Sequence, residues 1–248
     1  MAMVIIFCAI LILPSGAAQN TLHWYCAHVK DHQRPTVGKD LAFVEETGGY
    51  FLGRDEKVIY LTFDAGYENG NVEKILDTLR QEDVKAAFFI LGNLVTRNTD
   101  LVKRMVEEGH TVANHTLRHK NMSRLDDDGF LKELKEMEDL YFEHVGEKMA
   151  LYYRPPEGCF SRDNLVCASK NGYKTIFWSF AYPDWDNDRQ WSGEKAKSMI
   201  LENVHNGEVM LLHPTSATNA EILGDVIRVL KAEGYRFGTL DELTGATT

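Results

Sequence analysis

The sequence predicts an α/β protein built as a distorted (β/α)7-8 barrel, and two observations carry this prediction. Short apolar, β-branched or aromatic runs that are typical of strands alternate along the chain with stretches of helical periodicity, which favours parallel strands joined by helices. Polar side chains suited to chemistry follow several of these strands, always at the carboxyl end. Placement around a ring of strand ends favours a barrel over a doubly wound sheet, where sites gather at one switch point.

Seven strands and four amphipathic helices can be placed along the chain. The expected strands span residues 58–63, 86–91, 111–113, 151–153, 174–178, 208–212 and 235–237. Apolar residues at helical spacing predict helices around residues 72–79, 101–106, 130–141 and 226–230. Gly109 in EEGH and Gly234 in AEGY mark helix ends, since glycine readily adopts the left-handed conformation that follows many helices.

Composition excludes some classes of partner. The 248 residues are 44% hydrophobic and 26% charged, which is typical of a soluble globular protein. The formal net charge of −10 argues against nucleic acid or anionic lipid as the main partner. No G-x-G-x-x-G or G-x-x-x-x-G-K-[ST] motif is present, so nucleotide binding has no support.

The first 18 residues differ from the rest of the chain. An apolar stretch over residues 1–13 precedes the small residues of Pro14–Ala18, which predicts a secretory signal peptide or an N-terminal anchor; a buried strand is the alternative. We therefore expect an exported protein, with membrane contact only if this segment is uncleaved. The remaining cysteines form no C-x-x-C, and both one disulfide and none are consistent with the sequence: Cys26, Cys159 and Cys167.

Two stretches carry candidate active-site groups near the first and third strands. The run VIYLTF stops at Asp64, and a carboxylate at the end of a strand is well placed for chemistry. NHTLRH contains His115 and His119, and in a helical turn residues four apart share a face, so both imidazoles could bind one metal ion. Surface or capping histidines are the alternative interpretation.

Three further groups follow later strands. In RPPEG, Arg154 precedes two prolines that stiffen the chain, which suits a fixed cation paired with a carboxylate; an exposed loop arginine is the alternative. DWD offers Asp184 beside Trp185, either as a charged partner and a groove wall or as a turn with an apolar plug. LLH ends a strand in His213, suited to general acid catalysis, with a capped core histidine as the alternative.

Taken together and in this order, TFDAG, NHTLRH, RPPEG, DW and LLH resemble the five motifs of the polysaccharide deacetylase family, the NodB-like domain of carbohydrate esterase family four. The stretches TFDAGYENG, FWSFAYPDW and HPTSATNAE are similar to the δ-lactam-forming deacetylases of bacterial spore cortex. With the apolar segment at 1–18 as a signal or anchor, the resemblance implies an N-terminal extension at 19–54 and a catalytic domain at 55–248. It places the exported protein outside the cell, in the cell wall or in the spore intermembrane space. It also implies hydrolysis of an N-acetyl group on an aminosugar polymer.

The resemblance implies a role for each motif residue. Asp64 would be the base that activates water, Arg154 its orienting cation, and Asp184 the partner of the general acid His213. His115 and His119 would bind a divalent cation of the zinc, cobalt or manganese type. The substrate-binding residues would be Trp185, Leu211 and Pro155.

Two positions depart from the family pattern. Ala65 stands where most members have a second aspartate as the third metal ligand; the spore-cortex branch usually has asparagine. Two histidines and water make a weaker and less selective site than three protein ligands. Lys120 stands where the family commonly has proline, and a cation close to a metal site does not favour metal binding.

Three functions fit this pattern. The leading hypothesis is an exported deacetylase acting on peptidoglycan glycan strands, at N-acetylmuramic acid that has lost its peptide, on the route to muramic δ-lactam. The second is an N-acetylglucosamine deacetylase of peptidoglycan or a chitin-like polymer. The third, suggested by Ala65, is a catalytically silent glycan-binding protein, although the complete acid–base set argues against it.

Overall fold

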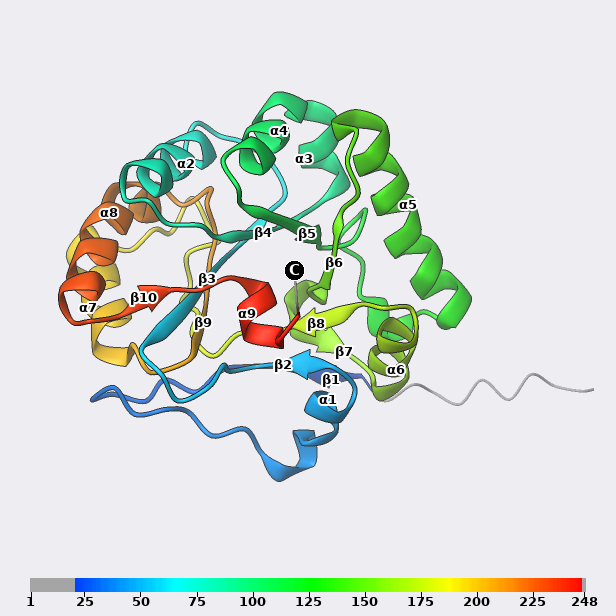
Figure 1. Cartoon of the computed structure of the whole chain (residues 1–248), viewed down its shortest axis with the longest axis horizontal. Coiled ribbons are helices and arrows are strands. Elements are labelled where there is room, and N and C mark those ends of the chain that lie inside the picture. The colour runs from blue at the N-terminus through cyan, green and yellow to red at the C-terminus, as the bar shows by residue number, and fades with distance from the viewer. Residues whose placement is uncertain (1–20, 247–248) are drawn as a thin grey trace, which may run out of the picture.

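The computed structural model describes residues 21–246 and shows a curled sheet of parallel strands surrounded by helices (Figure 1). All seven expected strands are present: β3 (Val58–Ala65), β4 (Ala87–Ile90), β5 (Thr111–Asn114), β6 (Ala150–Tyr153), β8 (Lys174–Ile176), β9 (Glu208–Leu212) and β10 (Arg236–Phe237). The four expected helices are α2 (Val72–Gln81), α4 (Thr99–Glu107), α5 (Asp127–Val145) and α8 (Ala217–Ala232). Gly109 and Gly234 follow α4 and α8 with φ of +78° and +88°, as expected for helix ends.

Shorter elements escaped the sequence pattern. Two-residue strands carry no readable alternation, and the added helices are brief or weakly amphipathic. They are β1 (Leu22–His23), β2 (Gly49–Tyr50), β7 (Cys159–Phe160), α1 (Phe43–Glu46), α3 (Gly92–Arg97), α6 (Arg162–Lys170), α7 (Gly193–Asn203) and α9 (Leu240–Thr244).

The sheet confirms the distorted barrel. Its strand order is β10-β3-β4-β5-β6-β8-β2, and β9 pairs with β3 in parallel register from Ile59 to Phe63. The segment after β8 reaches back to β9 through an isolated bridge between Phe180 and Met210. The strands thus curl into a half-barrel whose closure is irregular.

Alternation along β3 decides which way Asp64 faces. Ile59, Leu61 and Phe63 pack in the apolar cluster between the sheet and the surrounding helices. Val58 and Tyr60 pack in the second cluster, inside the curled sheet. Successive side chains of a strand point to opposite faces, so the even-numbered Asp64 continues the inner row and reaches the barrel interior at its carboxyl end.

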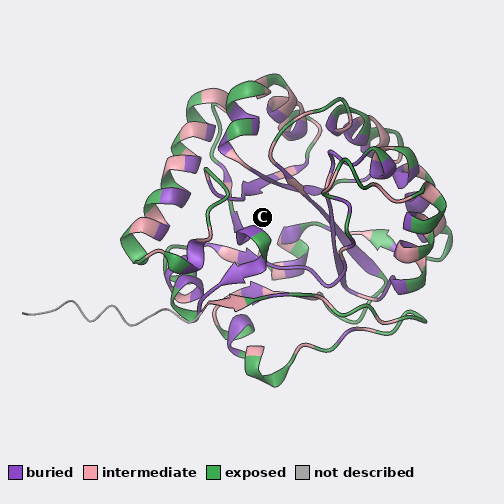
Figure 2. Cartoon of the chain, turned by 180° about the vertical axis from the view of Figure 1, so that it is seen from behind, coloured by how far each residue is buried: buried purple, intermediate pink, exposed green. Residues whose placement is uncertain are grey.

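The amino end of the barrel is closed. Helix α9 lies within the ring of strands (Figure 1), and its Leu240 and Leu243 join the inner apolar cluster. The hydroxyl of Tyr152 donates to Oδ1 of Asp241 at 2.5 Å and secures the helix to β6. Figure 2 shows buried residues lining the strands and the inner sides of the helices, with exposed residues outside. A site inside this barrel must therefore open at the carboxyl ends of the strands.

Residues 22–53 pack as part of the barrel. Strand β1 pairs with β7, and β2 adds a parallel strand beside β8. Trp24 is buried, and its Nε1 donates to the carbonyl oxygen of Trp178 at 2.8 Å. The expected signal or anchor at 1–18 lies outside the described residues. Within 21–246, no helix has the length and apolar character needed to cross a bilayer, and the cysteines are free thiols.

Candidate active site

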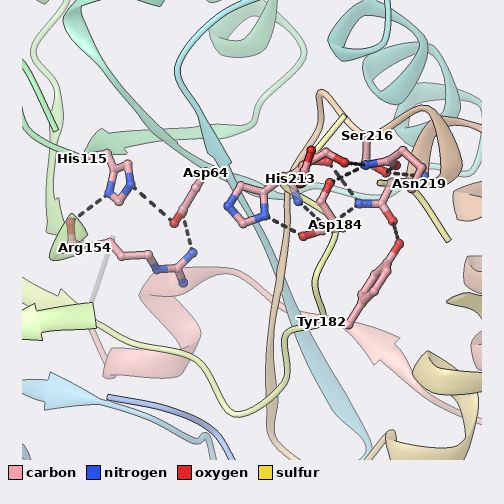
Figure 3. Close-up of polar contacts among 10 residues, drawn as sticks. Asp64, His115, Arg154, Tyr182, Asp184, His213, Ser216 and Asn219 are labelled. Atoms are coloured by element: carbon pink, nitrogen blue, oxygen red, sulfur yellow. Dashed lines mark hydrogen bonds and ion pairs between the residues drawn. The ribbon is translucent and has the colours of Figure 1, made fainter. Parts of the chain in front are cut away.

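Asp64 is held by a buried arginine from a neighbouring strand end. Oδ1 of Asp64 accepts from Nη1 of Arg154 at 2.9 Å, and the arginine is fully buried (Figure 3). Each of the other two nitrogens of Arg154 also donates, since Nε bonds the carbonyl oxygen of Ile176 and Nη2 that of Phe177, both at 3.0 Å. The guanidinium lies 4.2 Å from the ring centroid of Phe89. The cation is thus fixed in one orientation.

The charge of this carboxylate is stabilised. Burial, the strongest influence, would raise the pKa of Asp64, but His115, Arg154 and His213 together bring that pKa below its ordinary value. A fixed guanidinium favours the ionised form of a carboxylate beside it. Asp64 is therefore negatively charged at neutral pH.

His115 follows β5 and faces the same carboxylate. Its Nδ1 lies 3.0 Å from the carbonyl oxygen of Arg154, which can only accept, so Nδ1 carries the proton. Burial lowers the pKa of His115 to about 4, so the ring is neutral at neutral pH. Its Nε2 lies 3.5 Å from Oδ2 of Asp64 and keeps a lone pair suited to a metal ion.

The two histidines meet in a loop, and the expected helical turn is wrong. Residues 115–121 are not helical, and Thr116 and His119 both have left-handed backbones, with φ of 75° and 54°. This folding back brings the rings of His115 and His119 to a centroid separation of 5.1 Å at an angle of 70°. The pair therefore comes together by loop geometry rather than by helical spacing.

The donor set fits a divalent cation through these two imidazoles. Within the described part of the chain, no group of three or more His, Cys, Asp or Glu side chains is arranged to hold a metal ion. Ala65 is 1% exposed and packs in the apolar cluster beneath the helices, so position 65 contributes no ligand. Neutral imidazole nitrogen is nevertheless a common ligand of zinc-type cations.

His213 carries a second charged pair. Its Nδ1 donates to Oδ1 of Asp184 at 2.7 Å, and its backbone N–H donates to Oδ2 at 2.8 Å. Burial would lower the pKa of His213, but the carboxylate of Asp184 outweighs burial and raises it. The imidazolium form is thus favoured, as a general acid requires. Figure 3 shows the His213 ring directed toward Asp64.

Residues that the sequence motifs did not predict hold Asp184 in place. Asn219 donates through Nδ2 to Oδ2 of Asp184 at 2.6 Å and to the carbonyl of His213 at 3.0 Å. The hydroxyl of Tyr182 donates to Oδ1 of Asn219 at 2.5 Å. Asn219 is fully buried on α8. Its position three and four residues before Ile222 and Leu223, on the apolar face of the helix, is the sequence signal that could have indicated it.

Aromatic side chains stand at the rim. Trp185 is 59% exposed, and its ring centroid lies 6.2 Å from that of His213. Tyr67, also missed by the motifs, is 43% exposed, and its hydroxyl accepts from Nδ2 of Asn187 at 2.6 Å. Leu211 lies in the inner apolar cluster and is 4% exposed. Pro155, the other expected substrate contact, is buried beside Arg154.

Lys120 does not act as a free cation near the histidines. Its Nζ pairs with Oε2 of Glu133 at 2.9 Å. The concern that this lysine would weaken a metal site is therefore reduced, because its charge is balanced by a neighbouring carboxylate.

Comparisons with known proteins place the chain among polysaccharide deacetylases. A family profile described as polysaccharide deacetylase matches residues 52–176. The chain is 38% identical to the peptidoglycan-N-acetylmuramic acid deacetylase PdaA of Bacillus subtilis, over 96% of this chain and 94% of that protein. It is 32% identical to a peptidoglycan-N-acetylglucosamine deacetylase of Bacillus cereus, over 76% of this chain and 89% of that protein.

Solved structures of carbohydrate esterase family 4 have the same fold as this chain. The structure of Bacillus subtilis PdaA, a family 4 carbohydrate esterase, superposes with a TM-score of 0.88 at 37% identity, covering 91% of this chain and 97% of that chain. BA3943 of Bacillus anthracis, a pseudoenzyme of family 4, matches at 27% identity with a TM-score of 0.73, covering 79% of this chain and 68% of that chain.

Proposed function

This chain belongs to the polysaccharide deacetylase family, and we propose that it hydrolyses the N-acetyl group of peptide-free N-acetylmuramic acid in peptidoglycan. One observation carries the reaction: the Asp64–Arg154 pair and the His213–Asp184 pair face each other at the mouth of one barrel. Amide hydrolysis needs a base for water and an acid for the leaving nitrogen, and these two pairs supply them.

The proposed reaction proceeds in two proton transfers. Asp64 takes a proton from a water molecule as the water oxygen attacks the acetyl carbonyl carbon. The resulting tetrahedral species collapses as His213 gives its proton to the amide nitrogen, so the C–N bond breaks and acetic acid, which ionises to acetate, leaves with the free amine. Asp64 then loses its proton to solvent and His213 regains one from solvent. Arg154 keeps Asp64 ionised and oriented, and Asp184 keeps His213 protonated.

A divalent cation fits beside this pair. Deacetylases of this family are metal-dependent, and we assign its protein ligands to His115 and His119. When bound, such a cation polarises a carbonyl oxygen and lowers the pKa of a bound water. The neutral state of His115 and the proton on its Nδ1 leave Nε2 free for this purpose.

The choice of sugar is supported by similarity. The match to the N-acetylmuramic acid deacetylase spans 96% of this chain, including the N-terminal extension, whereas the match to the N-acetylglucosamine deacetylase spans 76% at lower identity. Deacetylation would leave a free amine that can close on the lactyl carboxylate to form muramic δ-lactam. An exported enzyme of spore cortex fits this substrate and the apolar N-terminal segment.

A silent glycan-binding protein is the competing function. Ala65 favours it, and one similar structure, BA3943 of Bacillus anthracis, is that of a family 4 pseudoenzyme. The retained network around Asp184 argues against it, because a binding protein has no need for an oriented acid and base. Trp185 at the rim suits either function, since aromatic faces pack well on sugar rings.

The test is mass spectrometry of defined peptidoglycan fragments after incubation with the purified chain and a divalent cation. Loss of acetyl from peptide-free muramic acid supports the proposed function. Loss from glucosamine alone supports deacetylation of the other sugar. Binding of the fragments without any loss of acetyl supports the silent protein.

A further inference from the structure

The buried face of α5 contains a carboxylate. Apolar residues form a stripe along this helix: Phe130, Leu134, Met137 and Tyr141. Glu133 lies on the same face and is 3% exposed. A buried carboxylate costs several kcal/mol unless it is paired and hydrogen-bonded, so its partners indicate why it is there.

Those partners lie on both sides of His119. Oε1 of Glu133 accepts the backbone N–H of Arg118 at 3.0 Å. Oε2 pairs with Nη1 of Arg118 at 3.3 Å and with Nζ of Lys120 at 2.9 Å. One carboxylate thus holds the residue before and the residue after the second imidazole.

His119 needs such support from outside its loop. Its backbone and that of Thr116 are left-handed, a conformation that is unfavourable for residues other than glycine and persists only where the surrounding structure fixes it. Within residues 21–246, no hydrogen bond holds the His119 ring; its backbone N–H donates to Oγ1 of Thr116 at 2.9 Å. The position of the ring therefore depends on what fixes the backbone.

We propose that Glu133 is a positioning residue that holds His119 where it can share a divalent cation with His115. The inference rests on the proposed function, because it presumes that the two imidazoles bind the cation. Arg118 and Lys120 are exposed on their other sides, so Glu133 is the buried point at which the loop is anchored to α5.

The experiment compares Glu133→Gln with Glu136→Gln in the full chain. Glu136 is the matched control, since its side chain is 38% exposed and pairs with the same Nη1 of Arg118 at 3.2 Å but accepts no backbone N–H of the loop. Titration calorimetry with Zn²⁺ and Mn²⁺ measures cation affinity, and circular dichroism measures the melting temperature. We expect Glu133→Gln to bind at least about tenfold more weakly, which corresponds to about 1.4 kcal/mol, and Glu136→Gln to match the wild type.

Each outcome decides the inference. Unchanged affinity in a folded Glu133→Gln variant, with only a lower melting temperature, makes Glu133 merely structural and overturns it. If that variant does not fold, Glu133→Asp keeps the negative charge but shortens the reach to the backbone N–H of Arg118 and to Lys120, and it must weaken binding in the same direction. Absence of cation binding by the wild type overturns the inference, whereas deacetylation by the wild type separately tests the proposed function.

Discussion

Replacing Asp184 by asparagine should disable His213 without disturbing the barrel. The two side chains have nearly the same shape, but the variant loses the negative charge 2.7 Å from Nδ1 of His213. Asp184 also accepts from the backbone of His213 and from Asn219 at Oδ2. An amide can satisfy those two donors only with its oxygen, which turns its NH2 toward Nδ1 and favours the neutral imidazole.

The magnitude follows from the charge pair. Two unit charges about 4 Å apart attract by about 4 kcal/mol at an effective dielectric of about 20. The His213 side chain is 25% exposed, so solvent reduces this attraction, and its loss should lower the pKa of His213. Burial, which acts in the opposite direction to Asp184, is unchanged in the variant.

The direction in which the pH–rate profile moves follows from the role of His213. The acid works when protonated, so activity falls as pH rises through its pKa, and Asp184 raises that pKa. In Asp184→Asn the falling limb of the pH–rate profile should therefore move to lower pH, and the rate at neutral pH should drop by about 10²–10⁴-fold.

The assay is acetate release from peptidoglycan fragments between pH 5 and 9, with Asp186→Asn as the control in the same loop. Asp186 bonds the backbone N–H of Asp188 and does not contact His213, so its variant should keep the wild-type profile. A falling limb that stays in place in Asp184→Asn would refute the reasoning and remove His213 from the acid role.

Three further substitutions test other parts of the site. Asp64→Asn should lower kcat by about 10²–10⁴-fold in a protein with an unchanged circular dichroism spectrum, and near wild-type turnover would remove Asp64 as the base. Tyr67→Ala should raise KM with kcat little changed, because the exposed ring flanks the site. The control Phe142→Ala, on the outer face of α5, should change neither constant. Equal KM values in the two variants would contradict a contact between Tyr67 and the substrate. Ala65→Asp should tighten cation binding measured by calorimetry, because a carboxylate adds a ligand beside the two imidazoles. It should also lower the melting temperature, because the new carboxylate enters a buried position. Unchanged affinity would mean that a side chain at position 65 cannot reach the imidazoles.

The strands and Asp64 could be predicted because their signals are local. Alternation within β3 places Val58 and Tyr60 on one face and Phe63 on the other, and the run ends at the residue that the site needs. The pairing of Asp64 with Arg154 was expected from a stiff arginine at another strand end, and the 2.9 Å ion pair is present. Their catalytic roles stay predictions until the variants are measured.

The support around Asp184 could not be predicted in this way. Asn219 lies 35 residues away in the sequence and Tyr182 reaches Asn219 across 37 residues, so no periodic pattern links them. The predicted helical turn at His115 and His119 was wrong for another reason. A spacing of four suggests a helical turn, but left-handed Thr116 is uncommon for a β-branched residue and leaves no mark in the sequence.

The two departures from the family pattern need opposite interpretations once their neighbours are known. Lys120 looked unfavourable as a bare cation, yet Glu133 neutralises it and draws it into the anchor of the histidine loop. Ala65 looked like one missing ligand, yet it also fills a place in the apolar cluster between sheet and helices, so a carboxylate there would carry a burial cost. With only two imidazoles as ligands, the affinity of a cation site in this chain must depend on how firmly they are held. The loop that carries His119 is therefore a determinant of metal affinity in the natural sequence.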